Sequence, residues 1–258
     1  MSFGPDLPAA EHENFARPPL KAMLGQVRFP PILRIADLGA LGGFQDAIRE
    51  EWPEFGQEQQ LGIVVGAEGV QQAGATRAFR FKAADRTWSA LLTPDALTLE
   101  ADLTAGQYTS YEDFSARFER IWTALTDNFR PAAVVQQGLR YVDHLQHELA
   151  PAEWGSLINP ELVGPLATIF QSGLVQALTD LRFRREDGML AFKYGLVPAG
   201  PENRLGFLLD FDYFTQERDD ATSVEAVMAR FDRYHEFIFD FFYWCLTDRA
   251  LEEFRHGS

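Results

Sequence analysis

The sequence predicts an α+β protein built around an antiparallel sheet. Short runs of alternating apolar and polar residues occur in two groups, separated by turn residues as in antiparallel meanders. Two longer segments, 111–129 and 224–244, carry apolar residues at helical spacing instead. Each group of short runs follows a strand and a helical segment and precedes one of these long helices. We therefore expect both long helices to pack on one face of a shared sheet.

The composition is that of an ordinary folded protein. The chain has 258 residues, 46% hydrophobic and 24% charged, which excludes wholesale disorder, collagen-like repeats and disulfide scaffolds. Its 38 acidic and 23 basic residues give a formal charge of −15, and the carboxylates are scattered, which favours a role in solubility. We expect no general nucleic-acid binding and no membrane association, because phosphates and anionic lipids repel such a chain.

Cysteine usage and the N-terminal segment predict the compartment. The single cysteine, Cys245, cannot form an intrachain disulfide, which fits a reducing environment. No apolar stretch reaches the roughly 20 residues needed to span a bilayer. The first 17 residues lack the basic-then-apolar pattern of a signal peptide. These features predict a cytoplasmic protein.

The first α+β half, 18–131, follows a flexible lead-in over residues 1–17. It begins with a strand from Leu20 to Phe29. Asp37 is expected to cap a helix from about Leu38 to Phe55, stopped near Pro53. Extended runs follow at 61–65, 77–81, 88–92 and 97–101, the last two joined by a hairpin turn at 93–96.

A capping box and a proline delimit the long helix of this half. Ser110 and Asp113 have the spacing of the capping box, and Pro131 ends the helix.

The second half, 132–255, repeats this order. A strand over 133–145 precedes a proline-broken stretch at 148–171 that holds one or two short helices. Three strands are expected, at 175–185, 190–196 and 205–213. Asp187-Gly188 predicts a type I′ hairpin turn between the first two of them.

The last long helix is expected to begin at a second capping box, formed by Thr222 and Glu225. Its segment 237–244 is apolar nearly all round, so this part is expected to be buried on several sides. The repeated order suggests an internal duplication within one continuous domain. Coincidence is the alternative, because meanders closed by a helix are common and no residue-level repeat is present.

Motifs of familiar chemistry are absent from the sequence. It contains no GxGxxG after a strand, no GxxxxGK[ST], no HExxH, no CxxC and no GxSxG. No motif of this kind therefore predicts a cofactor or a metal site, and the absence disfavours most NTPases, Rossmann dehydrogenases, zinc proteases and α/β-hydrolases.

The first of three polar groups with chemical potential lies on the strand at 133–145. Alternation places Arg140 and His144 on one face, and Tyr141 and Asp143 on the other. An aspartate–histidine pair could act as a general base or bind a metal. The alternative is a structural ion pair between Arg140 and Asp143, with solvated histidines at 144 and 147.

The other two groups lie on the last strand and the last helix. Asp210 and Asp212 share a strand face, where two carboxylates could bind a divalent cation or act as acid and base; the alternative is a solvated face. His235 could hydrogen-bond across to the sheet, or be a satisfied core residue. Cys245 is expected to be a buried, inert thiol.

An ordered set of short motifs resembles one protein family. The motifs are Pro18-Pro19 before a strand ending in Arg28-Phe29, Leu139-Arg140-Tyr141-Val142-Asp143, and Tyr234-His235-Glu236-Phe237-Ile238 with Phe241 and Leu246-Thr247-Asp248. From about Pro18 to Phe254, the chain resembles a sporadically distributed family of uncharacterised bacterial and archaeal proteins of similar length. That family prefers Leu at position 234 and often has Asn at 143. The resemblance implies an accessory role, for example in defence or toxin–antitoxin systems, and no established activity.

Three functional hypotheses follow. The first is a non-enzymatic binding protein whose sheet and aromatic-rich helices form a groove for a protein partner or an apolar small molecule. The second is an enzyme acting on phosphoester or nucleotide substrates, with its catalytic candidates brought together by the fold: Arg140, His144, Asp210, Asp212 and His235. The third is a structural homodimer formed through an edge strand or the apolar end of the last helix.

Overall fold

A computed structural model describes most of the chain. It covers residues 7–11, 13–66, 69–104, 110–167, 173–199, 204–215 and 217–256; at 60–75, at Pro165 and at Ala167 only the backbone is described. Within these ranges, no helix combines the length and the apolar character needed to cross a membrane.

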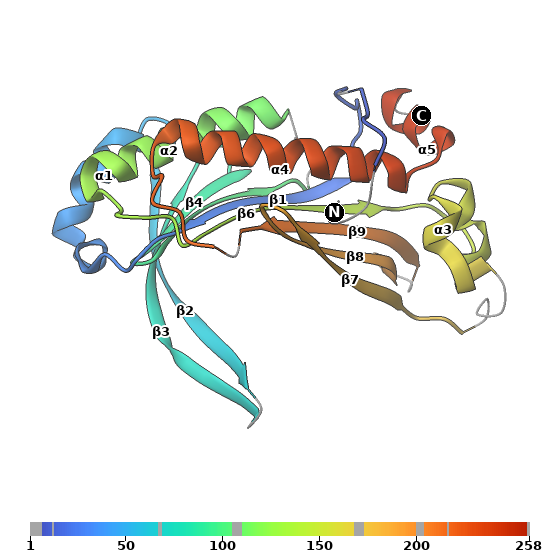
Figure 1. The fold of residues 1–258 in the computed structure, drawn as a ribbon, viewed down its shortest axis with the longest axis horizontal. Coiled ribbons are helices and arrows are strands. Elements are labelled where there is room, and N and C mark those ends of the chain that lie inside the picture. Colours follow the sequence, from blue (N-terminus) through green and yellow to red (C-terminus); the bar gives the residue numbers. More distant parts are fainter. Residues whose placement is uncertain are drawn as a thin grey trace.

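The described strands form a single nine-stranded sheet in the order β2-β3-β4-β5-β1-β6-β9-β8-β7 (Figure 1). Every pair of neighbouring strands is antiparallel. The α+β class and the antiparallel sheet are thereby confirmed. The strands are β1 (Leu20–Arg28), β2 (Glu54–Gly66), β3 (Gly69–Lys82), β4 (Trp88–Thr93), β5 (Ala96–Asp102), β6 (Gln136–Leu145), β7 (Ala177–Arg185), β8 (Gly188–Pro198) and β9 (Leu205–Phe214).

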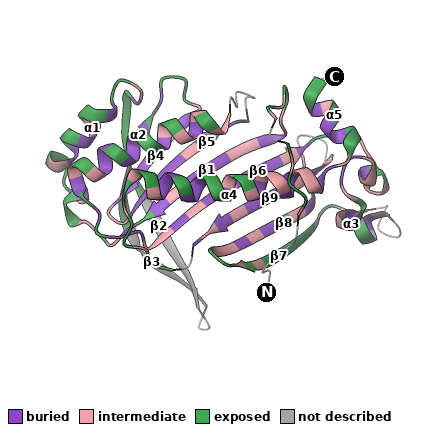
Figure 2. Cartoon of the chain, turned by 45° about the horizontal axis from the view of Figure 1, so that its top comes forward, coloured by how far each residue is buried: buried purple, intermediate pink, exposed green. Residues whose placement is uncertain are grey.

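Two long helices, α2 (Tyr111–Phe129) and α4 (Val224–Cys245), lie over the same face of the sheet (Figure 1 and Figure 2). The shorter helices lie toward the two ends of this layer. They are η1 (Leu33–Ala36), η2 (Leu38–Leu41), α1 (Gly42–Ile48), η3 (Pro151–Ser156), α3 (Pro160–Val163), η4 (Gly164–Ala167) and α5 (Asp248–His256).

Strand alternation directs one set of side chains into the core beneath α2 and α4. On β6, residues at odd positions from Gln137 to Leu145 are buried and those between them are partly exposed. The second half of α4 buries several aromatic side chains, as its apolar sequence predicts. The phenyl ring of Phe241, for example, contacts those of Phe192 and Phe211 at centroid distances of 4.6 and 5.4 Å.

A glycine lets α2 approach the sheet closely. A Cβ atom at Gly25 on β1 would lie 2.3 Å from Cζ of Phe114, so the Phe114 ring occupies the space that any other residue would fill. The helix begins as predicted, because the Ser110 hydroxyl accepts a hydrogen bond from the Asp113 amide. This packing places the first turn of α2 beside α4.

The helix predicted from Leu38 to Phe55 is wrong in its extent. A 3₁₀ turn capped by Asp37 leads into α1, which ends at Ile48. Phe55 belongs to β2, where it pairs with Phe81 of β3 and packs its ring 5.3 Å from that of Phe81. Sheet pairing thus overrides the helical spacing of the sequence.

Two further local predictions need correction. The N-cap of α4 is Ser223, whose hydroxyl accepts from the Ala226 amide, while the carbonyl of Thr222 accepts from Trp122 Nε1 at 3.1 Å. Thr222 therefore precedes the cap instead of forming it.

The hairpin between β7 and β8 exists, with Arg185 paired to Gly188. A type I′ turn requires positive φ at both central residues, and neither Glu186 nor Asp187 has it. Tertiary contacts of the turn outweigh its local preference: Tyr213 donates a 2.5 Å hydrogen bond to the Asp187 carboxylate.

The two halves share one feature of strand pairing, although five described strands lie in the first half and four in the second. The first strand of a half pairs with the last strand of its own meander, as β1 does with β5 and β6 with β9. The two first strands, β1 and β6, pair with each other in the middle of the sheet. The segment 61–65 lies on β2, but the burial predicted for its side chains lies outside the described residues.

Candidate functional site

A cavity of about 170 Å³ lies between the sheet and the helical layer. Its walls come from the start of α2, the middle of α4, and the ends of β1 and β6. The segment just before β1 contributes to its rim. Five of the lining residues are aromatic: Phe15, Tyr111, Tyr141, Phe239 and Phe242. Three are acidic, and no lysine or arginine is among the described lining residues.

The floor of the cavity is made by β6 and β1. Tyr141 and Asp143 are two residues apart on β6, so both point toward the helices. Leu20 of β1 is the register partner of Asp143 and also lines the cavity. A register irregularity between Leu20 and Ala22 leaves Lys21 without a register partner on either neighbouring strand. These positions place a carboxyl group at the base of an otherwise largely apolar space.

His235 joins the sheet to both long helices. Its Nδ1 lies 2.9 Å from the Tyr141 hydroxyl, and its ring stacks on that of Tyr111 at 3.8 Å with an interplanar angle of 4°. The Tyr111 hydroxyl in turn donates a 2.8 Å hydrogen bond to the Asp232 carboxylate. The expected contact between His235 and the sheet is present. It also orders the aromatic wall of the cavity.

Asp143 places a buried ionisable group at the base of the cavity. The residue is only 4% exposed, yet no hydrogen bond or ion pair joins its carboxyl group to any described residue. Burial, reinforced by the negative charge of Asp210, raises the pKa of Asp143 well above its usual value, and the Lys21 ammonium opposes this shift. Within the described ranges, this buried carboxyl group therefore keeps its hydrogen-bonding capacity available for a ligand.

The rim of the cavity is held by ion pairs. Arg255 of α5 donates to both carboxylate oxygens of Glu13, at 2.7 and 2.6 Å, and the Tyr243 hydroxyl donates to the same carboxylate. Phe15 packs edge-on against Phe242 and Phe254. These contacts fasten the segment before β1 onto α4 and α5, so this segment closes one side of the cavity.

The remaining predicted site residues lie on the opposite face of the sheet. Arg140 makes a bidentate ion pair with Asp210, in which both N–O distances are 2.8 Å. Asp212 of β9 is the register partner of Arg140. The alternative ion pair between Arg140 and Asp143 is wrong, because the two residues project from opposite faces. His144 also projects away from the helices; its Nε2 is buried without a hydrogen-bond partner, and burial lowers its pKa.

The five catalytic candidates are therefore divided. Arg140, His144, Asp210 and Asp212 occupy the face without helices, whereas His235 belongs to α4 on the other face. Burial raises the pKa of Asp212, although Arg140 opposes this shift. In the described ranges, no three His, Cys, Asp or Glu side chains gather closely enough to hold a metal ion. Cys245 is fully buried, and its thiol pKa is raised by that burial, as expected of an inert thiol.

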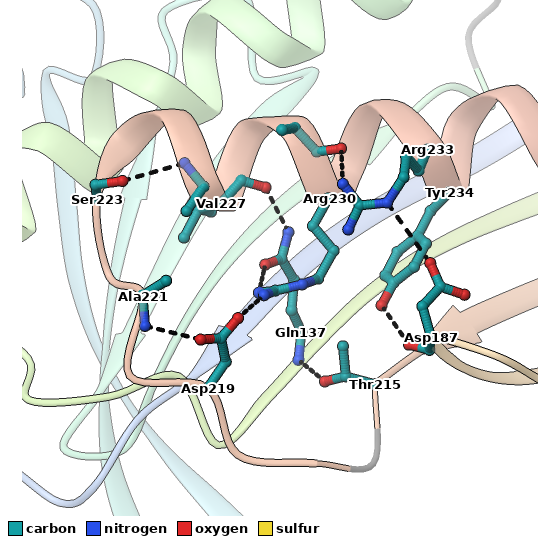
Figure 3. Close-up of polar contacts among 12 residues, drawn as sticks. Gln137, Asp187, Thr215, Asp219, Ala221, Ser223, Val227, Arg230, Arg233 and Tyr234 are labelled. Carbon is teal, nitrogen blue, oxygen red and sulfur yellow. Dashed lines mark hydrogen bonds and ion pairs between the residues drawn. The ribbon is translucent and has the colours of Figure 1, made fainter.

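A buried polar network that the sequence did not predict lies under the first half of α4 (Figure 3). Arg230, 8% exposed, donates to Gln137 Oε1 at 2.9 Å and to the Asp219 carboxylate. Gln137 Nε2 donates to the Val227 carbonyl at 2.8 Å. The sequence feature that could have predicted this network is an arginine that lies between Val227 and Phe231 on the apolar stripe of the helix. The network fixes α4 on β6 and so supports the cavity further along the same helix.

Comparisons with known proteins identify no family. No protein-family model matches the chain, and no curated protein is similar to it. Among solved structures, the di-domain ARO/CYC StfQ from the steffimycin biosynthetic pathway aligns over 92% of this chain and 98% of its own. Its sequence identity is 10% and its TM-score 0.18, too low to support an argument about fold or function. The architecture of the described chain is a nine-stranded antiparallel sheet with two long helices on one face.

Proposed function

We propose that this is a non-enzymatic binding protein that holds a small molecule in the cavity between β6, α2 and α4. The observation that carries the proposal is the carboxyl group of Asp143, which lies at the base of an aromatic cavity and has no hydrogen-bond or ion-pair partner among the described residues. Small-molecule sites are mostly apolar with a few convergent polar groups, and this cavity has that composition. Its volume of about 170 Å³ is close to that of engineered cavities that bind benzene. A compound with a single ring is therefore the expected size of ligand.

Binding is favoured over phosphoester chemistry by the distribution of charge. A phosphoryl group needs cationic or backbone N–H partners at the reacting centre. No lysine or arginine is among the described lining residues of the cavity, and the Arg140 guanidinium is occupied by Asp210 on the other face. An enzyme that used the five catalytic candidates together would need His235 on that face as well.

Native mass spectrometry of the purified protein with a mixture of single-ring amines, alcohols and acids tests the proposal. We expect an adduct of one compound per chain. The Leu20→Phe variant should lose the adduct, because a ring beside Asp143 fills the cavity. Leu24→Phe makes the same change on β1 at a partly exposed position on the opposite face, and should keep it.

The opposite results would reject a small-molecule role. An unliganded mass for the natural protein with every compound contradicts the proposal and directs attention to a protein partner. An adduct that survives in Leu20→Phe places the ligand outside the cavity, which contradicts the proposal equally.

We also propose that the chain arose by internal duplication and belongs to the sporadic bacterial and archaeal family that its motifs resemble. The equivalent pairings β1–β5 and β6–β9 support the duplication. A superposition of the two halves is its test: β1, β3 to β5 and α2 should overlay on β6 to β9 and α4 in that order. A fit no better than that of unrelated α+β units would contradict it.

An accessory role in the cytoplasm accords with family membership. Deletion of the gene should then leave growth unchanged under ordinary conditions and alter it only under a specific challenge, such as phage infection. A growth defect in the absence of any challenge would contradict that role.

A further inference from the structure

We propose that the ligand of the cavity is a small organic cation, a primary amine or a related ammonium compound attached to a single ring. This inference rests on the proposed function and specifies the chemistry of its ligand. The ammonium group would pair with the Asp143 carboxylate, and the ring would lie among the aromatic side chains of α2, α4 and the rim.

The lining of the cavity has the charge that such a ligand requires. Asp143, Glu13 and Glu112 all line it, and the described lining contains no side chain with a fixed positive charge. Glu13 is occupied by Arg255, so it contributes charge at the rim and not a binding group. Asp143 is the acidic residue at the base, where the low local dielectric strengthens the Coulomb attraction between its carboxylate and a cation.

The aromatic walls suit a cation as well. Cations are attracted to the negative faces of aromatic rings within about 6 Å of the centroid. The rings of Tyr111, His235 and Phe239 are neighbours on the cavity wall, with His235 3.8 Å from Tyr111 and 6.1 Å from Phe239. An amine that reaches Asp143 from the rim would pass beside these rings.

Lys21 does not take the place of the ligand. It belongs to β1 and interacts with Asp143 electrostatically, but it does not line the cavity and no ion pair joins it to Asp143. Although Lys21 favours the ionised form of Asp143, the surroundings as a whole favour the neutral carboxylic acid. A bound ammonium group would reverse that balance.

The test compares three probes of equal size by calorimetry at about 0.15 M salt, which screens the overall protein charge. Benzylamine is a cation, benzyl alcohol is neutral and benzoate is an anion. We expect the natural protein to bind benzylamine at least about tenfold more tightly than benzyl alcohol and to reject benzoate.

Two isosteric variants assign the effect to one carboxyl group. Asp143→Asn should weaken benzylamine binding by about 30-fold or more and leave benzyl alcohol within about threefold. Asp212→Asn removes an equal charge from the opposite face of the sheet and should leave both affinities unchanged. The Leu20→Phe variant should bind neither probe, which shows that binding occurs in the cavity.

Each contrary result separates this inference from the proposed function. The inference of a cationic ligand is overturned if benzyl alcohol or benzoate binds as tightly as benzylamine, or if Asp143→Asn leaves the preference for benzylamine intact. In both cases the cavity remains a binding site. If benzylamine binding is weakened as much by Asp212→Asn as by Asp143→Asn, the preference is a property of overall charge and the inference fails. If no probe and no compound of the mixture binds, both proposals fail together.

Discussion

Arg140 and Asp143 are three residues apart on β6 and project from opposite faces of the sheet. Arg140 pairs with Asp210 on the face without helices, whereas Asp143 faces α4 and the cavity. Because the side-chain period of a strand is two, an odd separation places two residues on different faces. Two groups that look like an ion pair in the sequence therefore belong to separate structures, one stabilising the sheet and one available to a ligand.

The ion pair of Arg140 is expected to stabilise the sheet. The Asp210 side chain is 9% exposed, so Arg140→Gln leaves a buried carboxylate without its partner. We expect the free energy of unfolding to fall by about 1–2 kcal/mol, less than for a fully buried pair because Arg140 is partly exposed. Urea denaturation measures this change. Arg182→Gln, at an exposed pair with a 3.8 Å separation, is the control and should change stability by less than about 0.5 kcal/mol. Equal losses in both variants would contradict a special role for Arg140.

Asp143 should make stability depend on pH. Because its pKa is raised by folding, the native state binds the proton of the Asp143 carboxyl group more tightly than the unfolded state does. The resulting stabilisation is complete at pH values below the pKa of the unfolded state, and it is lost as the pH rises through the pKa of the native state. The ionisable groups that interact electrostatically with it are Lys21, Asp210 and the thiol of Cys245. Asp143→Asn cannot ionise. It should change little near about pH 4 and raise the free energy of unfolding by about 1–3 kcal/mol near about pH 8.

Urea denaturation across this pH range compares the natural protein with Asp143→Asn. Asp212→Asn is the control, because nearby Arg140 and Lys193 oppose the rise in its pKa, so its gain at high pH should be smaller. A variant at position 143 that loses stability at high pH would show that the carboxylate is favourably paired, contrary to this account.

The network around Arg230 should hold α4 against the sheet. Arg230→Gln leaves Asp219 and Gln137 without their cationic partner, and we expect a loss of about 2–4 kcal/mol in the free energy of unfolding. Hydrogen exchange should also become faster in the segment 217–223, which Asp219 connects to α4. Arg233→Gln removes a guanidinium that is 54% exposed and 3.6 Å from Asp187, so it should cost less than about 0.5 kcal/mol. A reversed ranking of the two variants would refute the importance of the buried network.

The pairing of β7 with β8 should depend on Gly195. This residue has φ +136°, and a Cβ atom there would lie 2.0 Å from the Ala177 carbonyl oxygen. Gly195→Ala is therefore expected to cost about 1–3 kcal/mol and to loosen β7 at the edge of the sheet. Gly56→Ala is the matched control on β2, where a Cβ would contact nothing within 4 Å and stability should not fall. Thermal unfolding of the two variants distinguishes them, and an unaffected Gly195→Ala protein would contradict the predicted clash.

Local signals in the sequence located most elements of the fold. The alternation at 205–213 and the helical spacing at 111–129 predicted β9 and α2, because both patterns express burial on one face of a regular element. The errors occur where distant segments compete with local preference. Phe55 lies in a strand because it pairs with Phe81 of β3. The turn at Glu186-Asp187 departs from its local preference because Asp187 accepts a hydrogen bond from Tyr213.

The candidate site was predicted only in its parts. Tyr141, Asp143 and His235 were recognised as polar residues near apolar runs, but their spacing in the sequence says nothing about which of them meet. By itself the sequence determined the class of the fold and the face on which each strand residue lies, because these follow from periodicity within one element. Only the tertiary structure decided that Asp143 lies under α4 with no partner in the described part of the chain, while Arg140 is paired with Asp210. That outcome depends on strand register and helix packing, which join residues up to 94 positions apart, as at Tyr141 and His235.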